Sequence, residues 1–213
     1  MDTQSLGIPS PRPLPPARLI VGITGASGIP YGVRLLQVLQ PLPVETHLVI
    51  SRSAKVTMAW ESEWKPAAVE ALADRVHQND DIAACVSSGS YRTLGMVVAP
   101  CSMKTLAEIA TGVTSTLIAR AADVVLKERR RLVLVTREAP LHLGHLRNMV
   151  AATEMGAVIF PPVPAFYAKP QSLEDMVDHT VGRVLDLFDL EVGLAARWRE
   201  DPAVSAPDQK SAP

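Results

Sequence analysis

The sequence has 213 residues and a formal net charge of −1 at pH 7. This length suits one sizeable α/β domain, and the near-neutral charge argues against nucleic-acid binding, which needs a basic surface. Hydrophobic residues make up 47% of the chain, enough for a large core, yet the longest apolar runs are far shorter than the roughly 20 residues of a membrane-spanning helix.

The two ends of the chain differ from its middle. Residues 1–17 contain five prolines and no apolar segment, so we expect a disordered lead-in and not a signal peptide. Residues 191–213 are expected to form a loose C-terminal tail. The only two cysteines are Cys85 and Cys101, which without a secretory leader indicate reduced thiols and a cytoplasmic protein.

Strand-like and helix-like segments alternate in a single expected domain, residues 18–190. The predicted strands are Leu19–Thr24, Thr46–Ile50, Met96–Ala99, Leu132–Val135 and Ala157–Phe160. The predicted helices are Pro30–Leu39, Ser53–Trp64, Ala67–Val76, Leu106–Ala110, Leu117–Arg130 and Leu173–Leu190. Continuous apolar strands separated by helices predict an α/β fold with a parallel sheet covered on both faces.

Polar residues follow most of these strands. They are Ser27, Ser51, Ser102, Glu138 and the proline-rich loop 161–170. Ligands of parallel sheets bind beyond the carboxyl ends of the strands, so we expect these residues to line one crevice.

The stretch Thr24–Gly28 (TGASG) follows the first predicted strand and precedes a helix. Its glycines do not have the G-x-G-x-x-G spacing of the dinucleotide fingerprint. The small residues Gly25 and Ala26 still allow close backbone approach to an anion, and Ser27 adds a hydroxyl. The alternative is an ordinary tight turn between a strand and a helix.

A second hydroxyl-rich stretch, Pro100–Thr105, follows a later strand. Ser102 and Thr105 flank a helix start, where hydroxyls and free amides together suit a phosphate. A plain helix cap is the alternative. We expect Cys101 to be a small buried residue and not a nucleophile.

Charged residues surround the strand Leu132–Val135. The preceding cations, Lys127 and residues 129–131, lie at a predicted helix C-terminus, where the helix dipole favours them and solvation is the default interpretation. Arg137 and Glu138 directly follow the strand. A carboxylate near cations at the crevice is typical of a group that transfers protons.

The histidines give little information. His142 and His145 have a spacing that chelates metal on a helix, but no third ligand is evident and we expect a polar turn there. His47, His77 and His179 are scattered along the sequence. We therefore predict no metal.

Taken together and in order, these motifs resemble the flavin prenyltransferase family, the UbiX type once labelled aromatic acid decarboxylases. The resemblance covers roughly residues 18–198. The matching stretches are TGASG at 24–28, Ser51, APCSMKTLAEIATG at 99–112, RAADVVLKERRRLVLVTREAPLHLGHLRNM at 120–149 and GAVIFPPVPAFYAKPQSLEDMVDHTVGRVLDLF at 156–188. The sequence departs from the pattern at Thr136, where a proline commonly precedes the Arg-Glu pair.

The resemblance implies a single-domain, Rossmann-like, doubly wound parallel sheet. It implies a metal-independent enzyme that joins a dimethylallyl group from dimethylallyl phosphate to N5 and C6 of reduced FMN, producing prenylated FMN for a UbiD-type decarboxylase. It also implies a homo-oligomer, commonly a dodecamer with sites between subunits.

The resemblance further assigns site residues. FMN contacts are expected from Gly25, Ala26, Ser27, Ser51, Ser102, Met103, Lys104, Thr105 and Arg137. The prenyl phosphate is expected to contact Lys127, Arg137, Tyr167 and Arg183, with Arg120 and Trp198 nearby. Catalytic roles are expected for Glu138, Glu61, Ser27 and Lys127, with Glu138 as the proton-transfer group.

Two other functions compete with this interpretation. A flavin-dependent cysteine decarboxylase of related fold relies on a histidine base and a PASANT-type segment, where this chain has APCSMKT. A passive FMN carrier would need Ser27, Ser102 and Arg137, but it would have no use for a phosphate clamp.

Overall fold

The computed structural model describes residues 16–198, so most of the lead-in (1–15) and of the tail (199–213) lies outside the described residues. Six strands form one sheet in the order β3-β2-β1-β4-β5-β6, and every neighbouring pair is parallel. The strands are β1 (Ala17–Ile23), β2 (Val44–Ile50), β3 (Arg75–His77), β4 (Gly95–Cys101), β5 (Arg131–Thr136) and β6 (Ala157–Ile159). The predicted parallel α/β fold is confirmed.

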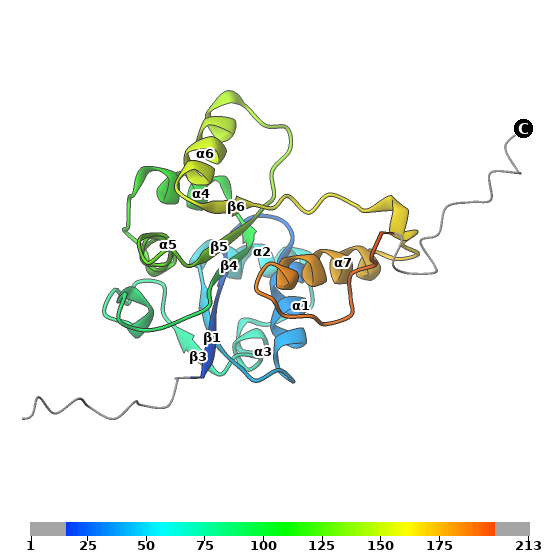
Figure 1. Ribbon diagram of the computed structural model, residues 1–213, viewed down its shortest axis with the longest axis horizontal. Coiled ribbons are helices and arrows are strands. Elements are labelled where there is room, and N and C mark those ends of the chain that lie inside the picture. Colours follow the sequence, from blue (N-terminus) through cyan, green and yellow to red (C-terminus); the bar gives the residue numbers. More distant parts are fainter. Residues whose placement is uncertain (1–15, 199–213) are drawn as a thin grey trace, which may run out of the picture.

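Helices cover both faces of this sheet (Figure 1). They are α1 (Ile29–Leu39), α2 (Arg52–Glu61), α3 (Pro66–Glu70), α4 (Met103–Thr111), α5 (Leu117–Lys127), α6 (Leu143–Glu154) and α7 (Leu173–Asp186), with short 3₁₀ helices η1 (Cys85–Ser87) and η2 (Phe166–Ala168). No helix between residues 16 and 198 is both long and apolar enough to cross a bilayer.

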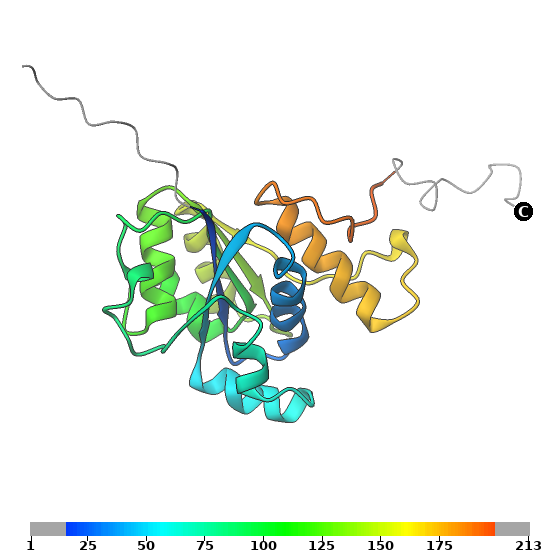
Figure 2. The ribbon, with the colours of Figure 1, turned by 90° about the horizontal axis from the view of Figure 1, so that it is seen from below.

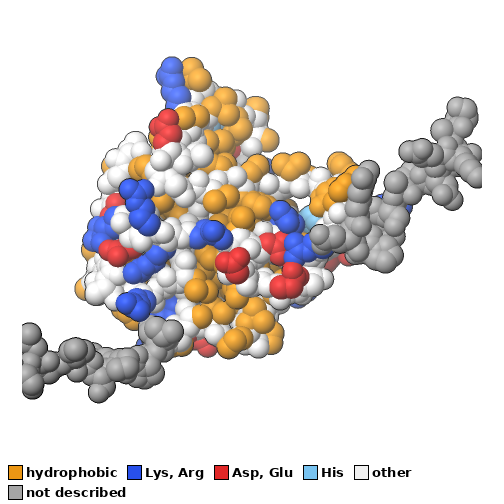
Figure 3. Space-filling view, in the orientation of Figure 1, with side chains coloured by type: hydrophobic (Ala, Val, Ile, Leu, Met, Phe, Trp, Pro, Cys, Tyr) orange, Lys and Arg blue, Asp and Glu red, His pale blue; other side chains and the backbone are white. Residues whose placement is uncertain are grey.

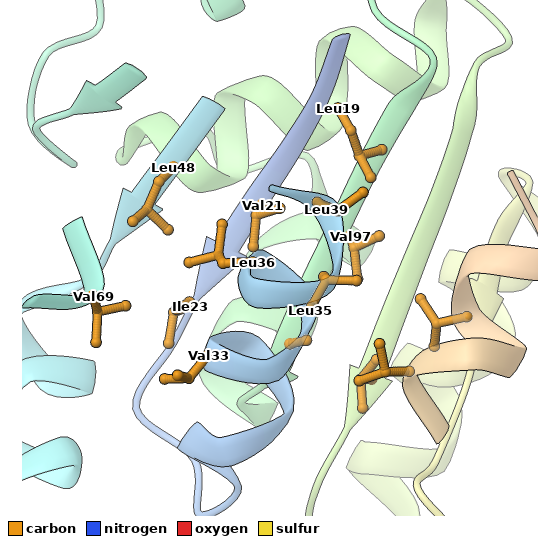
Figure 4. Packing of buried hydrophobic residues seen from close by; sticks show 14 of the residues in the cluster. Leu19, Val21, Ile23, Val33, Leu35, Leu36, Leu39, Leu48, Val69 and Val97 are labelled. Carbon is orange, nitrogen blue, oxygen red and sulfur yellow. The ribbon is translucent and has the colours of Figure 1, made fainter. Parts of the chain in front are cut away.

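The sheet separates two hydrophobic cores because alternate strand residues point to opposite faces. One core joins the sheet to α1, α2, α3 and α7 through side chains such as Val21, Leu36 and Leu185 (Figure 4). The other joins it to α4, α5 and α6 through side chains such as Met96 and Leu106. Every residue of β4 is buried, which explains why its sequence is a continuous apolar run.

The segment around residue 75 corrects one prediction. The expected helix Ala67–Val76 ends at Glu70 as α3, and Arg75–His77 forms the edge strand β3. The Asp74 carboxylate accepts hydrogen bonds from the backbone N–H (2.7 Å) and the hydroxyl (2.9 Å) of Thr46 on β2. These bonds hold the chain beside β2, and no local helix preference reveals them.

Two further predictions are wrong in detail. The expected polar turn around His142 and His145 is the start of α6, which His142 caps by accepting a hydrogen bond from the N–H of Gly144 at 3.0 Å. The last helix ends at Asp186 and not at Leu190, and its first residue, Leu173, is exposed. Figure 2 shows why: residues 161–172 run away from the sheet, so the start of α7 lies outside the core.

Candidate active site

The order of the strands reverses between β1 and β4, whose carboxyl ends flank the crevice where ligands of doubly wound sheets bind. Thr24, which is buried, joins these two ends. Its hydroxyl donates a hydrogen bond to the carbonyl of Pro100 (2.7 Å) and accepts one from the N–H of Ser102 (2.8 Å). The TGASG turn and the Ser102 segment are therefore fixed against each other, as expected for one crevice.

Gly25 lies where the β1–α1 turn meets the start of α2. A Cβ added at Gly25 would lie 2.4 Å from both the Cβ and the Oγ of Ser53. A side chain at this position would force the two segments apart. The glycine thus places the backbone of Ala26 and Ser27 beside the hydroxyls that begin α2.

The amino terminus of α1 already has an anionic partner. The Glu61 carboxylate, at the end of α2, accepts hydrogen bonds from the N–H groups of Gly28 (2.8 Å) and Ile29 (3.1 Å). A carboxylate at this position is stabilised by the helix dipole, as a phosphate would be. Glu61 therefore occupies the amides that the turn sequence suggested for a phosphate.

Serine hydroxyls cap the other two helices at this edge. Ser51 accepts a hydrogen bond from Ala54 N–H at 3.1 Å, and its Oγ lies 3.1 Å from that of Ser53. Ser102 caps α4 by accepting a hydrogen bond from the N–H of Thr105 at 3.3 Å. Ser102 is therefore a helix cap, as the alternative interpretation of its segment predicted. The two caps also place the hydroxyls of Ser51 and Ser102 at the crevice.

The first residues of α4 complete this group. Ser102 Oγ also lies 3.2 Å from the Thr105 hydroxyl, and Met103 and Lys104 form the first turn. The Lys104 ammonium pairs with Glu108 on the same helix at 2.8 Å. Cys101, just before the cap, is fully buried, and burial raises the pKa of its thiol to about 12, so it is not a nucleophile at neutral pH.

Arg137 is the cation that the structure brings to this edge. Its backbone N–H donates to Cys101 O (3.3 Å), and its Nε donates to the carbonyl of Ser27 (3.2 Å). Burial raises the pKa of Tyr31, and the charge of Arg137 opposes that rise. Glu138 is exposed, and its carboxylate contacts only the N–H of Ala139 among the described residues (3.0 Å).

Tyr167, Arg183 and Trp198 all lie on the arm formed by η2, α7 and the residues after it. The rings of Tyr167 and Trp198 pack edge to face with centroids 5.3 Å apart. Tyr167 Oη lies 3.4 Å from Nε2 of His179, whereas the Arg183 guanidinium pairs with Asp186 at 3.1 Å. Two of the expected clamp residues, Tyr167 and Trp198, are therefore in contact within one chain.

A groove of about 620 Å³ separates α1 from α7. Gly28 and Tyr31 line it near the strand ends, and Trp64 and Met176 line it further out. Within it the Arg34 guanidinium of α1 pairs with the Asp178 carboxylate of α7 at 2.6 Å.

Lys127 lies at the other end of the sheet. It is the last residue of α5, which precedes the start of β5, whereas Arg137 follows the end of β5. Six residues of strand at roughly 3.3 Å each separate the two ends by about 20 Å. The Lys127 ammonium pairs with Glu128 at 2.5 Å, and Arg120, one α5 turn before Asp123, pairs with that carboxylate at 2.6 Å. One chain therefore does not bring Lys127 to the other expected clamp residues.

Three residues near the candidate site were missed by the sequence analysis. They are Ser53 and His179, which contact Ser51 and Tyr167 respectively, and Tyr31, whose pKa burial raises while the charge of Arg137 opposes the rise. The sequence contains enough information to predict Ser53. It lies two residues after Ser51, so its hydroxyl is expected at the same edge of the sheet. The sequence does not predict a role for Tyr31 or His179, because their surroundings depend on how the helices pack.

Comparison with known proteins agrees with this geometry. A family model described as Flavoprotein matches residues 8–185. Flavin prenyltransferase UbiX of Escherichia coli K12 is 60% identical over 185 residues, which cover 85% of this chain and 98% of that protein.

Two crystal structures are similar throughout their length. AnUbiX (PadA1), in complex with FMN and dimethylallyl pyrophosphate, superposes with a TM-score of 0.85 at 57% identity, covering 86% of this chain and 98% of that one. A dodecameric FMN-dependent UbiX-like decarboxylase from Escherichia coli O157:H7 gives 0.83 at 56% identity, covering 85% and 98%. The resemblance inferred from the motifs is thereby confirmed, and the chain belongs to the Flavoprotein family and, within it, to the UbiX-type flavin prenyltransferases.

Proposed function

We propose that this protein transfers a dimethylallyl group from dimethylallyl phosphate to N5 and C6 of reduced FMN. The observation that carries the proposal is the position of Arg137, whose guanidinium bonds to Ser27 at the strand ends beside the Ser102 cap. A relative at 57% identity binds both FMN and dimethylallyl pyrophosphate, which supports the same pair of ligands here.

The donors at this edge fit FMN chemically. Hydroxyls of Ser27, Ser51, Ser102 and Thr105, together with the free amides of Met103 and Lys104 at the start of α4, suit the phosphate and the polar edge of a flavin. The close approach of Gly25 to Ser53 places the backbone of Ala26 and Ser27 beside the hydroxyls at the start of α2. Because Glu61 occupies the start of α1, we assign the phosphate to the hydroxyl-capped helix starts.

The cations and aromatic rings suit the prenyl donor. Departure of phosphate from an allylic carbon develops negative charge on oxygen, which Arg137, Arg183 and Lys127 stabilise as preorganised cations. Tyr167 and Trp198 hold the apolar part of the donor, and Arg120 lies at the margin. The flavin supplies the nucleophilic ring atoms and a π surface for developing positive charge.

Glu138 is the proposed proton-transfer residue. Ring closure at C6 adds a proton to the prenyl double bond and removes one from C6, so it needs a group at the crevice that gives and takes a proton. The Glu138 carboxylate is exposed and has one local hydrogen bond, whereas Glu61 is held by two amides. Glu61 therefore acts by fixing the start of α1, and Glu138 takes the proton.

The site is completed by a neighbouring copy of the chain. Lys127 is about one strand length from Arg137 within a chain, so its ammonium reaches the donor phosphate only from another subunit. A relative at 56% identity is dodecameric, and we propose the same assembly here. The product, prenylated FMN, is proposed to serve a UbiD-type decarboxylase in the cytoplasm, where the free thiols Cys85 and Cys101 stay reduced.

Anaerobic mass spectrometry tests the activity. The full chain, reduced FMN and dimethylallyl monophosphate or diphosphate should yield a flavin heavier by one C5H8 unit, with the faster donor identifying the preferred ester. Glu138→Gln should bind FMN normally but form product at least about 100-fold more slowly, the lower end of the range for loss of a general acid or base. Glu63→Gln, an exposed carboxylate at the end of α2, is the matched control.

Two results would overturn the assignment. Unchanged flavin mass with both ligands bound would favour the FMN carrier. The second is a Glu138→Gln variant that binds FMN more weakly but forms product at the normal rate once FMN is bound. Glu138 would then serve in FMN binding and not in proton transfer.

A further inference from the structure

Two histidines and a cysteine meet beside strands β2 and β3, and none of them belongs to the candidate active site. His47 on β2 and His77 on β3 lie on the same face of the sheet, because His77 pairs in register with Val49, two residues after His47. Cys85 begins η1, which covers this face. One ligand atom of each residue lies within 4.8 Å of the other two.

We propose that His47, His77 and Cys85 form a binding site for Zn²⁺. Imidazole nitrogen and thiolate sulfur are the ligands that zinc prefers, and three protein ligands with one open position make a complete set. The Nδ1 of His47 lies 2.9 Å from the Nε2 of His77. Two nitrogens bound to one zinc are about 3.3 Å apart in tetrahedral geometry, so the nitrogen pair needs only a small opening.

The outer contacts of His47 hold its ring in the orientation that a zinc ligand needs. Its other nitrogen, Nε2, lies 3.1 Å from the Tyr91 hydroxyl and 3.3 Å from a Glu45 carboxylate oxygen. A hydrogen bond from Nε2–H to these oxygens leaves the lone pair on Nδ1, facing His77. A histidine ligand whose second nitrogen donates to a carboxylate is the usual arrangement at zinc sites.

Two arginines beside the site share a single carboxylate. Arg18 and Arg75 lie close by, but each pairs with Glu45, at 3.1 and 2.6 Å. Burial lowers the pKa of His47 to about 4, so its ring is neutral at pH 7. Burial also lowers the pKa of His77, while Asp81 opposes the change. The ring nitrogens and the thiol lie close enough together to share one ion.

We expect zinc at this position to link separate segments of the chain. β3 is only three residues long, and the segment 78–94 that follows contains one short 3₁₀ helix. A metal bound to His47, His77 and Cys85 ties that segment to β2 and β3. We therefore expect zinc to stabilise the fold without taking part in prenyl transfer.

Metal titration of the full chain tests the site. After treatment with a chelator, the chain should bind one Zn²⁺ per subunit by calorimetry, and Co²⁺ should give a thiolate-to-cobalt charge-transfer band. His77→Gln and Cys85→Ser should each weaken zinc binding by more than about 100-fold. This loss is larger than the one usually caused by replacing a residue that only hydrogen-bonds to a metal ligand. His142→Gln, which alters the stacked surface pair His142–His145, should leave zinc affinity unchanged.

A second measurement needs no variant. Zn²⁺ should slow modification of the Cys85 thiol by a disulfide reagent, while the fully buried Cys101 stays unreactive. Cobalt spectra without a thiolate band, zinc affinity unchanged in Cys85→Ser, or loss of zinc binding in His142→Gln would each overturn the proposal. None of these readouts depends on prenyltransferase activity.

Discussion

Single residues at the carboxyl edge of the sheet work mainly by holding backbone in place. Thr24 bridges β1 and β4, Ser51 and Ser102 cap α2 and α4, and Glu61 caps α1 from the far end of α2. Each contact satisfies donors that a helix start leaves without intrahelical partners. The site is therefore built before any ligand binds.

Replacement of Glu61 should measure this contribution. Glu61→Ala leaves the amides of Gly28 and Ile29 without their acceptor and should lower the free energy of unfolding by about 1–2 kcal/mol. Glu61→Gln keeps an oxygen acceptor but loses the charge at the helix start, so it should cost about 0.5 kcal/mol. Urea denaturation without flavin measures both.

The control for this experiment is Glu63→Ala. Glu63 is exposed at the end of the same segment, and its replacement should change the stability by less than about 0.5 kcal/mol. Equal stability of Glu61→Ala and Glu63→Ala would show that the cap contributes nothing.

At the scale of elements, the close approach of α1 to β4 decides where the TGASG turn lies. Gly32 is buried in α1, and a Cβ there would lie 2.3 Å from the carbonyl oxygen of Ala99 on β4. That oxygen belongs to the backbone and cannot move aside as a flexible side chain would. The glycine allows the helix to lie directly on the strand.

Gly32→Ala should therefore lower the free energy of unfolding by about 1–3 kcal/mol, the usual cost of overpacking, although alanine is the better helix former by about 1 kcal/mol. Because the turn before α1 shifts with the helix, FMN affinity should fall as well. Thermal or urea denaturation and a flavin titration measure the two effects.

Gly112→Ala provides the comparison. Gly112 ends α4 with φ +71 and has nothing within 4 Å of the added Cβ, so only the left-handed backbone is penalised, by about 1 kcal/mol. Its FMN affinity should not change. Full stability in Gly32→Ala would mean that α1 does not require this close contact.

At the scale of the whole molecule, the apolar side chains left on the surface indicate further subunits. α6 exposes Leu143, Leu146 and Val150, which share one helix face (Figure 3). The arm adds Phe166, Val163 and Leu173, each about 70% exposed. Contiguous apolar surface of this kind is typical of protein interfaces.

Leu146→Glu should disrupt the assembly, because a charge on this stripe becomes buried without a partner. Analytical ultracentrifugation should show a smaller particle, and prenyl transfer should fall as sites lose the neighbouring Lys127. Gln40→Glu adds the same charge at the exposed end of α1 and should leave both properties unchanged. A normal particle mass in Leu146→Glu would exclude α6 from the interface.

The sequence by itself determined the parallel sheet and the edge at which ligands bind. Buried strands such as β4 are continuous apolar runs, and the hydroxyls and charges that follow them must gather at the carboxyl ends of parallel strands. Ser27, Ser102 and Arg137 were predicted in this way, and the structure brings them together.

Only the tertiary structure decided the rest, because the deciding contacts join residues far apart in the chain. β3 exists through the bonds of Asp74 to Thr46, 28 residues away, and His47 meets His77 across 30 residues. Glu61 reaches α1 only after α2 has packed beside it. Lys127 is separated from Arg137 by the length of β5. The nine residues between them in the sequence do not reveal this distance, because they include the end of a helix and a whole strand.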